Sequence, residues 1–531
     1  MVLLTLALVS CSIVLAVIYV VKNLKTSPQL KSLLINSEWK LLELPPGPRP
    51  LPILGNMHLL GKYEVPFQAF NDLKEIYGDI FQLTLGSFQC VVVNNYQLIK
   101  EVLITKGAIF GGRPDFKRFH KLFGDDRSNS ESKSPNSPMY ANSNFFVCCS
   151  FSILRLVLRA RNTTETGPTL LLAEDSLEEL RPALTVGFHE AQLFLEELNH
   201  ELEESPVVDI KPLVMRACAN MFTQYMCSKR FPYQDKDFQR MVRNFDEIFW
   251  DVNHGYAVDF LPWLLPLYKG HMSKLSGWAQ DIREFLLANI VDERAARINA
   301  TKDPEAEDFT DALLIHLKED PVLTWEHVMF ELEDFIGGHS AVGNLVMLCL
   351  VNIIKHEEVA AKIRRELDQV TGRSRNVDLF DKPRLPYTEA TIFETLRVAS
   401  SPIVPHVATE DTELAGYAVP KNTVVFVNNL DFNLSEEYWE DAAAFKPERF
   451  INDKGEVVKP AHFIPFSTGK RTCIGQKLVL GFSFILLASI VQHFDIGPSP
   501  TKPPKAIPGM VALPPETFSL TFVPRSGAQS N

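Results

Sequence analysis

The sequence predicts a large, mainly α-helical domain with a small β-sheet region. Two apolar stretches, 324–354 and 474–490, are long enough to form buried helices. Short runs rich in β-branched residues, near 80–94 and 423–427, are typical of strands. From about residue 190 onward no long linker or charge run divides the chain. One domain is therefore favoured, although a chain of 531 residues would often hold roughly three.

Composition excludes some classes of function. The formal net charge of −12 argues against nucleic acid as a partner. The eight cysteines show no spacing of a disulfide framework, so free thiols in a reducing compartment are expected. A hydrophobic share of 46% is ordinary for a globular protein and leaves enzyme and binding functions open.

An uncharged apolar run at residues 2–21 is long enough to cross a bilayer as a helix. A cleaved signal peptide would have a basic start and a shorter apolar core. Here no basic residue precedes the run, whereas Lys22, Lys25 and Lys31 follow it. Because positive charge stays on the cytosolic side, we expect a single-pass anchor with its N-terminus in the lumen and the body in the cytosol.

The expected organisation has three parts: an anchor at 1–24, a linker with a proline-rich hinge at 25–50, and a main domain at 51–525. In the main domain the stretch 125–175 is anomalous. Its first half is rich in Ser and Asn, which is typical of an unstructured loop. The alternative is an artefact of gene prediction, such as translated intron, which we favour. Sequencing the transcript across codons 120–180 distinguishes the two.

Helices follow in the second half of the chain. Thr324 is a candidate N-cap for a helix that runs to about 354 and is apolar all round, as expected for a helix through the middle of a domain. A second helix, 356–371, carries charges at helical spacing. A third, 474–490, begins directly after Cys473.

The segment from Phe466 to Gly475 has the pattern of a metal-binding thiolate loop. Gly469 permits a tight turn close to a flat cofactor, and Gly475 removes a Cβ from the segment that follows. Cys473 lies before a helix N-terminus, where free N–H groups favour an anionic sulfur. Arg471 can pair with a cofactor carboxylate.

This loop resembles the haem-binding loop of the cytochrome P450 haem-thiolate monooxygenases. The helical pair Glu394 and Arg397, followed by Arg449, resembles the family's buried structural network, and Pro45–Pro48 resembles its hinge. The resemblance implies the P450 fold and haem b (iron protoporphyrin IX) with an axial thiolate. The residues expected to hold the haem, with Cys473 as the metal ligand, are Cys473, Arg471, His406, Phe466, Gly469 and Gly475.

The family also has a helix that crosses the oxygen-binding face, with a Gly-rich motif followed by an acid and an alcohol that steer protons. The matching residues here are Gly337, Gly338, His339, Ser340 and Ala341. The glycines are kept, but Ala341 has no proton to give. Three alternatives remain open. Ser340 or His339 supplies protons with ordered water, the enzyme rearranges an oxygenated substrate without oxygen activation, or the protein only binds haem or a sterol.

The motif Phe335–Asn344 is similar to insect spook-type enzymes of the ecdysteroid-making Halloween group, which implies an early oxidation of 7-dehydrocholesterol. The resemblance further implies oxygen as a substrate, an NADPH-dependent flavoprotein reductase as electron donor, and the endoplasmic reticulum membrane as location. The segment 125–175 lacks the tryptophan that the family uses near a propionate. Arg155, Arg159 and Arg161 are candidate substitutes.

Overall fold

The computed structural model describes residues 30–35, 38–65, 67–124, 181–321, 323–507 and 509–525. The anchor expected at 2–21 and the whole of the anomalous stretch 125–175 lie outside these residues, as do the three candidate arginine substitutes. The chain divides into two compact units. The smaller combines the chain up to Pro114 with Phe260–Trp263 and Pro405–Asn428, and the larger contains the rest.

The smaller unit consists of the main β-sheet, two separate strand pairs and a few short helices. Its strands are β1 (Leu30–Ile35), β2 (Glu38–Glu43), β3 (Ile80–Leu85), β4 (Phe88–Val93), β6 (His406–Val407), β7 (Thr412–Leu414), β8 (Tyr417–Val419) and β9 (Val424–Val427). Its helices are α2 (Met57–Leu60), α3 (Gln68–Tyr77), α4 (Tyr96–Lys100) and the short turns η1 (Glu101–Thr105) and η2 (Ile109–Gly111). One sheet has the order β3-β4-β9-β6, with β4 and β9 parallel, while β1-β2 and β7-β8 form separate pairs. The strands predicted near 80–94 and 423–427 are confirmed.

The proline-rich hinge packs against strand β3. Gln82 N donates to Pro46 O at 2.7 Å. A Cβ on Gly47 would lie 2.2 Å from Gln82 O, far inside van der Waals contact. Glycine is therefore required here, because only a residue without a side chain lets the two main chains approach this closely.

The larger unit is predominantly helical. Its helices are α5 (Lys117–Leu122), α8 (Arg181–Glu204), α9 (Lys211–Cys227), α10 (Lys236–Val252), α11 (Ala257–Phe260), α12 (Lys269–Leu286), α13 (Asp292–Ala300), α14 (Phe309–Glu319), α15 (Trp325–Gly337), α16 (His339–Lys355), α17 (Glu357–Thr371), α18 (Pro386–Ala399), α19 (Asn429–Asn433) and α20 (Gln476–His493). Short turns are η4 (Pro262–Tyr268), η5 (Leu287–Val291), η6 (Leu379–Arg384), η7 (Pro447–Phe450) and η8 (Gly469–Arg471). Strands β10 (Phe494–Pro498), β11 (Leu520–Pro524) and β5 (Val207–Val208) form one small sheet.

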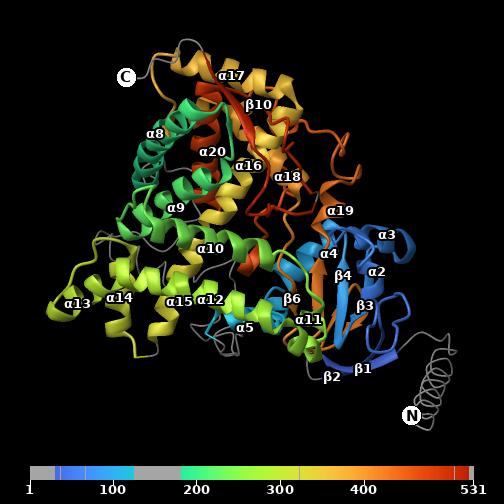
Figure 1. The fold of residues 1–531 in the computed structure, drawn as a ribbon. Helices are drawn as coiled ribbons and strands as arrows, with labels where there is room; N and C mark the ends of the chain where they lie inside the picture. The colour runs from blue at the N-terminus through green and yellow to red at the C-terminus, as the bar shows by residue number, and fades with distance from the viewer. Residues whose placement is uncertain are drawn as a thin grey trace, which may run out of the picture. The chain divides into compact units, whose positions relative to one another are not determined.

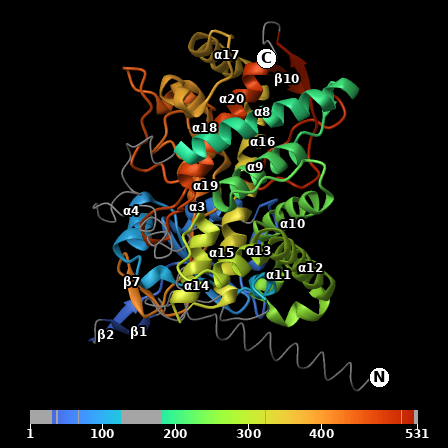
Figure 2. The same cartoon turned by 90° about the vertical axis from the view of Figure 1, so that its left-hand side faces the viewer.

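Four helices, α8, α9, α16 and α20, pack together as a bundle within this unit, and α18 also packs on α16 (Figures 1 and 2). Helices α10 and α12 run side by side next to α9 and α15 (Figure 1). The central helix is buried almost throughout because apolar residues cover all of its faces. The prediction of a mainly helical fold with a small sheet region is confirmed.

The central helix begins where the sequence indicated. The Thr324 hydroxyl accepts from His327 N, and His327 Nδ1 accepts from Thr324 N at 3.1 Å, which completes a capping box. The helix is divided at Gly338, where α15 ends and α16 begins, and continues to Lys355. The helices predicted at 356–371 and 474–490 correspond to α17 and α20.

Two helical stretches among the described residues are long and apolar enough to cross a membrane, Trp325–Lys355 and Gln476–His493. Both are mostly buried within the protein. They are therefore explained as core helices, and neither is the anchor that the sequence predicts.

Candidate functional site

The thiolate loop is held by main-chain bonds and by left-handed residues. Cys473 N donates to Phe466 O at 2.9 Å, and Thr472 N donates to Gly469 O at 3.3 Å. Gly469 has a φ of 76° and Ser467 a φ of 61°. Glycine adopts this conformation without strain, whereas a serine there is uncommon. The local sequence thus fixes the turn that precedes Cys473.

The Cys473 sulfur lies at the start of α20. Burial raises the pKa of its thiol to about 11, and hydrogen bonds from the N–H groups of Gly475 and Gln476 act in the opposite direction. Those two donors are what a bound thiolate needs. A Cβ on Gly475 would lie 3.9 Å from the sulfur, an ordinary contact. The described protein atoms therefore place no steric demand for glycine at that position.

The donor set decides which kind of metal group fits. Among the described residues, no three His, Cys, Asp or Glu side chains gather at a position that could hold a metal ion. A single thiol supplied with two N–H donors suits a metal whose other ligands belong to a prosthetic group. The residues present thus fit haem and do not fit a metal ion bound by protein side chains alone.

Two candidate propionate partners lie in different units. Arg471 closes the turn η8 and its side chain is buried in the larger unit. His406 lies on β6 in the smaller unit, where its Nδ1 bonds to Phe110 O at 2.7 Å. Because a carbonyl can only accept, Nδ1 carries the hydrogen.

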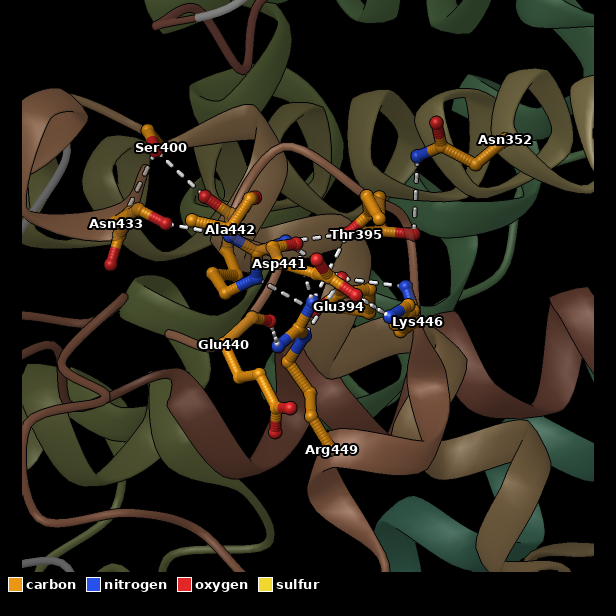
Figure 3. A network of polar contacts seen from close by, with 12 residues as sticks. Asn352, Glu394, Thr395, Ser400, Asn433, Glu440, Asp441, Ala442, Lys446 and Arg449 are labelled. Atoms are coloured by element: carbon orange, nitrogen blue, oxygen red, sulfur yellow. Dashed lines mark hydrogen bonds and ion pairs between the residues drawn. The ribbon is translucent and has the colours of Figure 1, made fainter. Parts of the chain in front are cut away.

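Glu394, Arg397 and Arg449 form a buried polar network (Figure 3). Arg397 binds Glu394 with both ends of its guanidinium, at 2.8 and 2.7 Å. Arg449 Nε donates to the same carboxylate at 3.1 Å. The structure therefore brings together the three residues that the sequence associates.

Main-chain carbonyls complete this network (Figure 3). Arg397 donates to Asn433 O at 2.6 Å, to Ala442 O at 2.8 Å and to Ala444 O at 3.0 Å. The carboxylate of Glu394 also accepts from Lys446 N at 2.8 Å. A buried charge pair is tolerated only when its remaining hydrogen-bonding capacity is filled. Arg397 thus ties α18 to the segment 433–446, whose irregular main chain needs donors.

The glycine pair at the break in the central helix has a packing role. A Cβ on Gly337 would lie 3.0 Å from the ring of Phe245, and one on Gly338 would lie 3.1 Å from the ring of Phe222. Both distances are tighter than real Cβ contacts usually show. Close approach of α9 and α10 therefore explains two glycines that cost stability in a helix interior. Their presence does not by itself require an oxygen site.

His339 and Ser340 are fully buried. His339 Nδ1 bonds to Ile336 O at 2.5 Å, and its ring meets Phe245 edge to face. Burial lowers the pKa of His339 to about 4, so the imidazole is neutral at pH 7, with hydrogen on Nδ1 and a lone pair on Nε2. Among the described residues, His339 Nε2 and the Ser340 hydroxyl have no hydrogen-bond partner. Of the two, only Ser340 has a free proton to donate.

One face of the central helix is less buried than the rest. Between residues 327 and 351, Gly338 and Ala341 are the two positions with intermediate exposure, and every other residue is buried. Positions three and four apart share a helix face, so Asp334 lies on this face as well. This is the side of the central helix that is least completely covered by other described residues.

Three buried acids stand one turn before the glycines, and the sequence analysis missed them. They are Glu331, Glu333 and Asp334. Glu333 pairs with Arg283 at 2.7 Å, yet burial raises its pKa to about 7. The sequence did contain a signal for them: three acidic residues in a helix that was expected to be apolar all round. Burying a carboxylate without a partner costs free energy, so acids in such a helix indicate a special environment.

A second buried network was also missed. Arg118 on α5 binds Asp259 at 2.6 Å and Asp251 at 2.7 Å, and its guanidinium lies 4.4 Å from the ring centre of Tyr256. Asp259 is thus held by an arginine 141 positions earlier in the sequence, a contact that no local pattern indicates.

Comparison with known proteins agrees with this geometry. Residues 45–134 and 178–522 match the model of the family described as Cytochrome P450. The chain is 43% identical over 504 residues to Cytochrome P450 307a1 of Drosophila melanogaster, covering 90% of this chain and 89% of the relative. It is 31% identical over 523 residues to Cytochrome P450 2E1 of Rattus norvegicus, covering 93% and 97%. The family resemblance and its insect branch are confirmed.

The match to the family leaves out residues 135–177, most of the stretch that the sequence marks as anomalous. After that gap the match covers the central helix, the Glu394 network and the thiolate loop. The chain therefore belongs to the cytochrome P450 family, whose enzymes are haem-thiolate monooxygenases that bind oxygen and take electrons from a redox partner.

Proposed function

We propose that this cytochrome P450 oxidises a sterol, in an early step of ecdysteroid biosynthesis from 7-dehydrocholesterol. The observation that carries the proposal is the motif Phe335–Asn344, which lacks the family's alcohol at Ala341 as spook-type enzymes do. The insect relative, 43% identical over most of both chains, supports the same branch. Both point to one subgroup within a large family.

In this proposal Cys473 would bind the haem iron as a thiolate, and the N–H groups of Gly475 and Gln476 would stabilise its negative charge. Bound haem supplies oxygen activation, which a thiolate ligand promotes. Phe466 and Gly469 shape the loop, while Arg471 and His406 bind the propionates.

On the other side of the haem, Ser340 is the proton donor that we propose. Its hydroxyl has no partner among the described residues, whereas neutral His339 spends its only N–H on Ile336 O. His339 then acts as a positioning residue that fixes the break at Gly338. Gly337 and Gly338, which let α10 and α9 pack closely, also make room for oxygen in this proposal.

Electrons come from an NADPH-dependent flavoprotein reductase in this proposal. Lys470, exposed on the turn beside Cys473, and Lys477 on α20 offer positive charge to an acidic partner surface. The apolar run 2–21 anchors the protein in the endoplasmic reticulum membrane with the main domain in the cytosol. Trp263 and Leu267, 61% and 80% exposed, suit contact with the membrane surface.

The ligand assignment is tested by spectroscopy. Reduced wild-type protein with carbon monoxide should show the Soret shift of a thiolate-bound haem, and Cys473→Ala should abolish it. Cys218→Ala is the matched control, because Cys218 is a buried free thiol in α9. A normal shift in the Cys473 variant would remove the assignment.

The reaction is tested with labelled dioxygen. Reconstitution with reductase, NADPH and 7-dehydrocholesterol should place the label in a product. Turnover without label and without dependence on NADPH would favour an isomerase or dehydratase. That alternative stays open because Ala341 lacks the alcohol found at this position in the family. A sterol that changes the haem spin state but is never converted would indicate a binding protein.

A further inference from the structure

Asp334 is a buried carboxyl group with no hydrogen-bond partner among the described residues. Its side chain is 8% exposed, and no described residue lies within hydrogen-bond distance of its Oδ1. Its neighbour Glu333 is held by Arg283 at 2.7 and 3.0 Å. Buried polar groups in proteins are nearly always satisfied, so an exception calls for an explanation.

The position of Asp334 on the helix points toward a ligand. Gly338 N donates to Asp334 O at 3.2 Å, so the two residues are one helical turn apart on one face. That face continues to Ala341, and between residues 327 and 351 Gly338 and Ala341 are the two partly exposed positions. The carboxyl group therefore lies one turn before the part of the helix that a bound molecule could reach.

Distance along the helix distinguishes a role in proton delivery to oxygen from a role in substrate binding. With a rise of about 1.5 Å per residue, Asp334 lies about 6 Å from Gly338 and about 10 Å from Ala341 along the axis. A carboxyl group at that distance is more than one hydrogen bond away from the region beside Ala341, to which the family motif assigns oxygen. It suits a polar group on the substrate that lies several ångströms from the carbon to be oxidised.

The protonation state restricts the chemistry of that polar group. Burial, with the neighbouring carboxylates of Glu331 and Glu333, raises the pKa of Asp334 well above its usual range. A neutral carboxyl group both donates and accepts a hydrogen bond. Uncharged hydroxyl and keto groups match it without bringing a charge into an apolar site.

We propose that Asp334 binds a hydroxyl or keto group of the substrate and so determines which carbon of an otherwise apolar molecule is oxidised. The inference rests on the proposed sterol substrate and adds the residue that orients it. Asp334 is a specificity-determining residue in this account, and proton donation stays with Ser340.

The test compares two sterols that differ in one group. Full-length, haem-loaded protein in detergent is titrated with 7-dehydrocholesterol and with cholesta-5,7-diene, which lacks the 3-hydroxyl, and dissociation constants are read from the haem spin-state change. Wild-type protein should bind the hydroxylated sterol about tenfold more tightly. Asp334→Ala should reduce that ratio to about one, and Asp334→Asn, which still donates and accepts, should keep most of it.

Thermal unfolding without sterol separates binding from a structural role. Asp334→Ala should unfold at the same temperature as wild type or higher, because it removes an unsatisfied buried group. Glu333→Gln is the matched control on the same helix, and it should lower the unfolding temperature while it keeps the tenfold ratio. A lower unfolding temperature for Asp334→Ala would show a structural partner and overturn the proposal.

The remaining outcomes distinguish this inference from the proposed function. Equal affinity of wild-type protein for both sterols would overturn the role of Asp334 and leave the sterol substrate standing. A tenfold ratio that persists in Asp334→Ala would have the same meaning. Failure of wild-type protein to bind either sterol would contradict the proposed function, and it would also remove the proposed role of Asp334 in binding the sterol.

Discussion

Two buried polar regions of the larger unit, the Glu394 network and the middle of the central helix, differ in how completely their groups are paired. Around Glu394 and Arg397, carboxylate, guanidinium and main-chain carbonyls satisfy one another (Figure 3). On the central helix, Asp334, His339 and Ser340 each keep a buried polar atom with no partner among the described residues. Full pairing is what stability requires, whereas unpaired groups cost stability and remain available to a ligand. The first region therefore has the character of a scaffold and the second that of a site.

The largest expected loss of stability comes from removing one partner of the paired network around Glu394. Arg397→Ala leaves the Glu394 carboxylate buried without its main partner, and we expect a loss of about 3–5 kcal/mol in the free energy of unfolding. Arg365, exposed on α17, provides the control, and Arg365→Ala should stay within about 0.5 kcal/mol. Chemical denaturation measures both, with haem content followed alongside. Equal losses in the two variants would contradict the scaffold role.

An intermediate effect is expected from pH. The pKa of His339 falls from its ordinary 6.5 to about 4, so the folded state favours the neutral ring. The stability that this provides is complete above pH 6.5 and is lost as pH falls toward 4, by about 3 kcal/mol. His339→Asn should flatten the stability curve between these pH values in denaturation experiments. An unchanged slope in that variant would show that the ring is not held neutral.

The smallest changes in the free energy of unfolding are expected when one serine hydroxyl is removed from each region. Ser400 donates to Arg397 O at 2.7 Å and accepts from Asn433 Nδ2 at 3.2 Å. Ser400→Ala should therefore cost about 1–2 kcal/mol, whereas Ser340→Ala should stay within about 0.5 kcal/mol because its hydroxyl has no described partner. Both values come from denaturant midpoints.

The two variants Ser340→Ala and Ser400→Ala also test the function of Ser340. If the hydroxyl donates a proton, Ser340→Ala should lower turnover while the free energy of unfolding stays unchanged. A loss of stability in Ser340→Ala as large as in Ser400→Ala would end the contrast between the two regions.

Some of the site could be predicted because its geometry is local. Glu394 and Arg397 lie three residues apart on a helix, which brings their side chains together whatever surrounds them. The turn before Cys473 follows from Gly469, and the start of the central helix from Thr324. Such features depend on a few neighbouring residues, so the sequence is sufficient.

Other parts of the site depend on contacts that no local pattern reveals. The ring of Phe222 explains Gly338, and the ring of Phe245 explains Gly337, from helices about a hundred residues earlier. The sequence predicts that both glycines make room for oxygen, and that role stays a prediction; their packing against these rings could not be seen from the sequence.

The helical fold with a small sheet and the turn that precedes Cys473 could be predicted from the sequence, since each depends on short-range patterns, and the resemblance of the thiolate loop indicated the family. Only the tertiary structure decided which buried charges have partners. Arg118 reaches Asp251 and Asp259 across more than a hundred residues, while Asp334 has no described side chain to pair with. The physical reason is that desolvation and pairing depend on how distant segments pack, and a side chain's neighbours in space are not its neighbours in sequence.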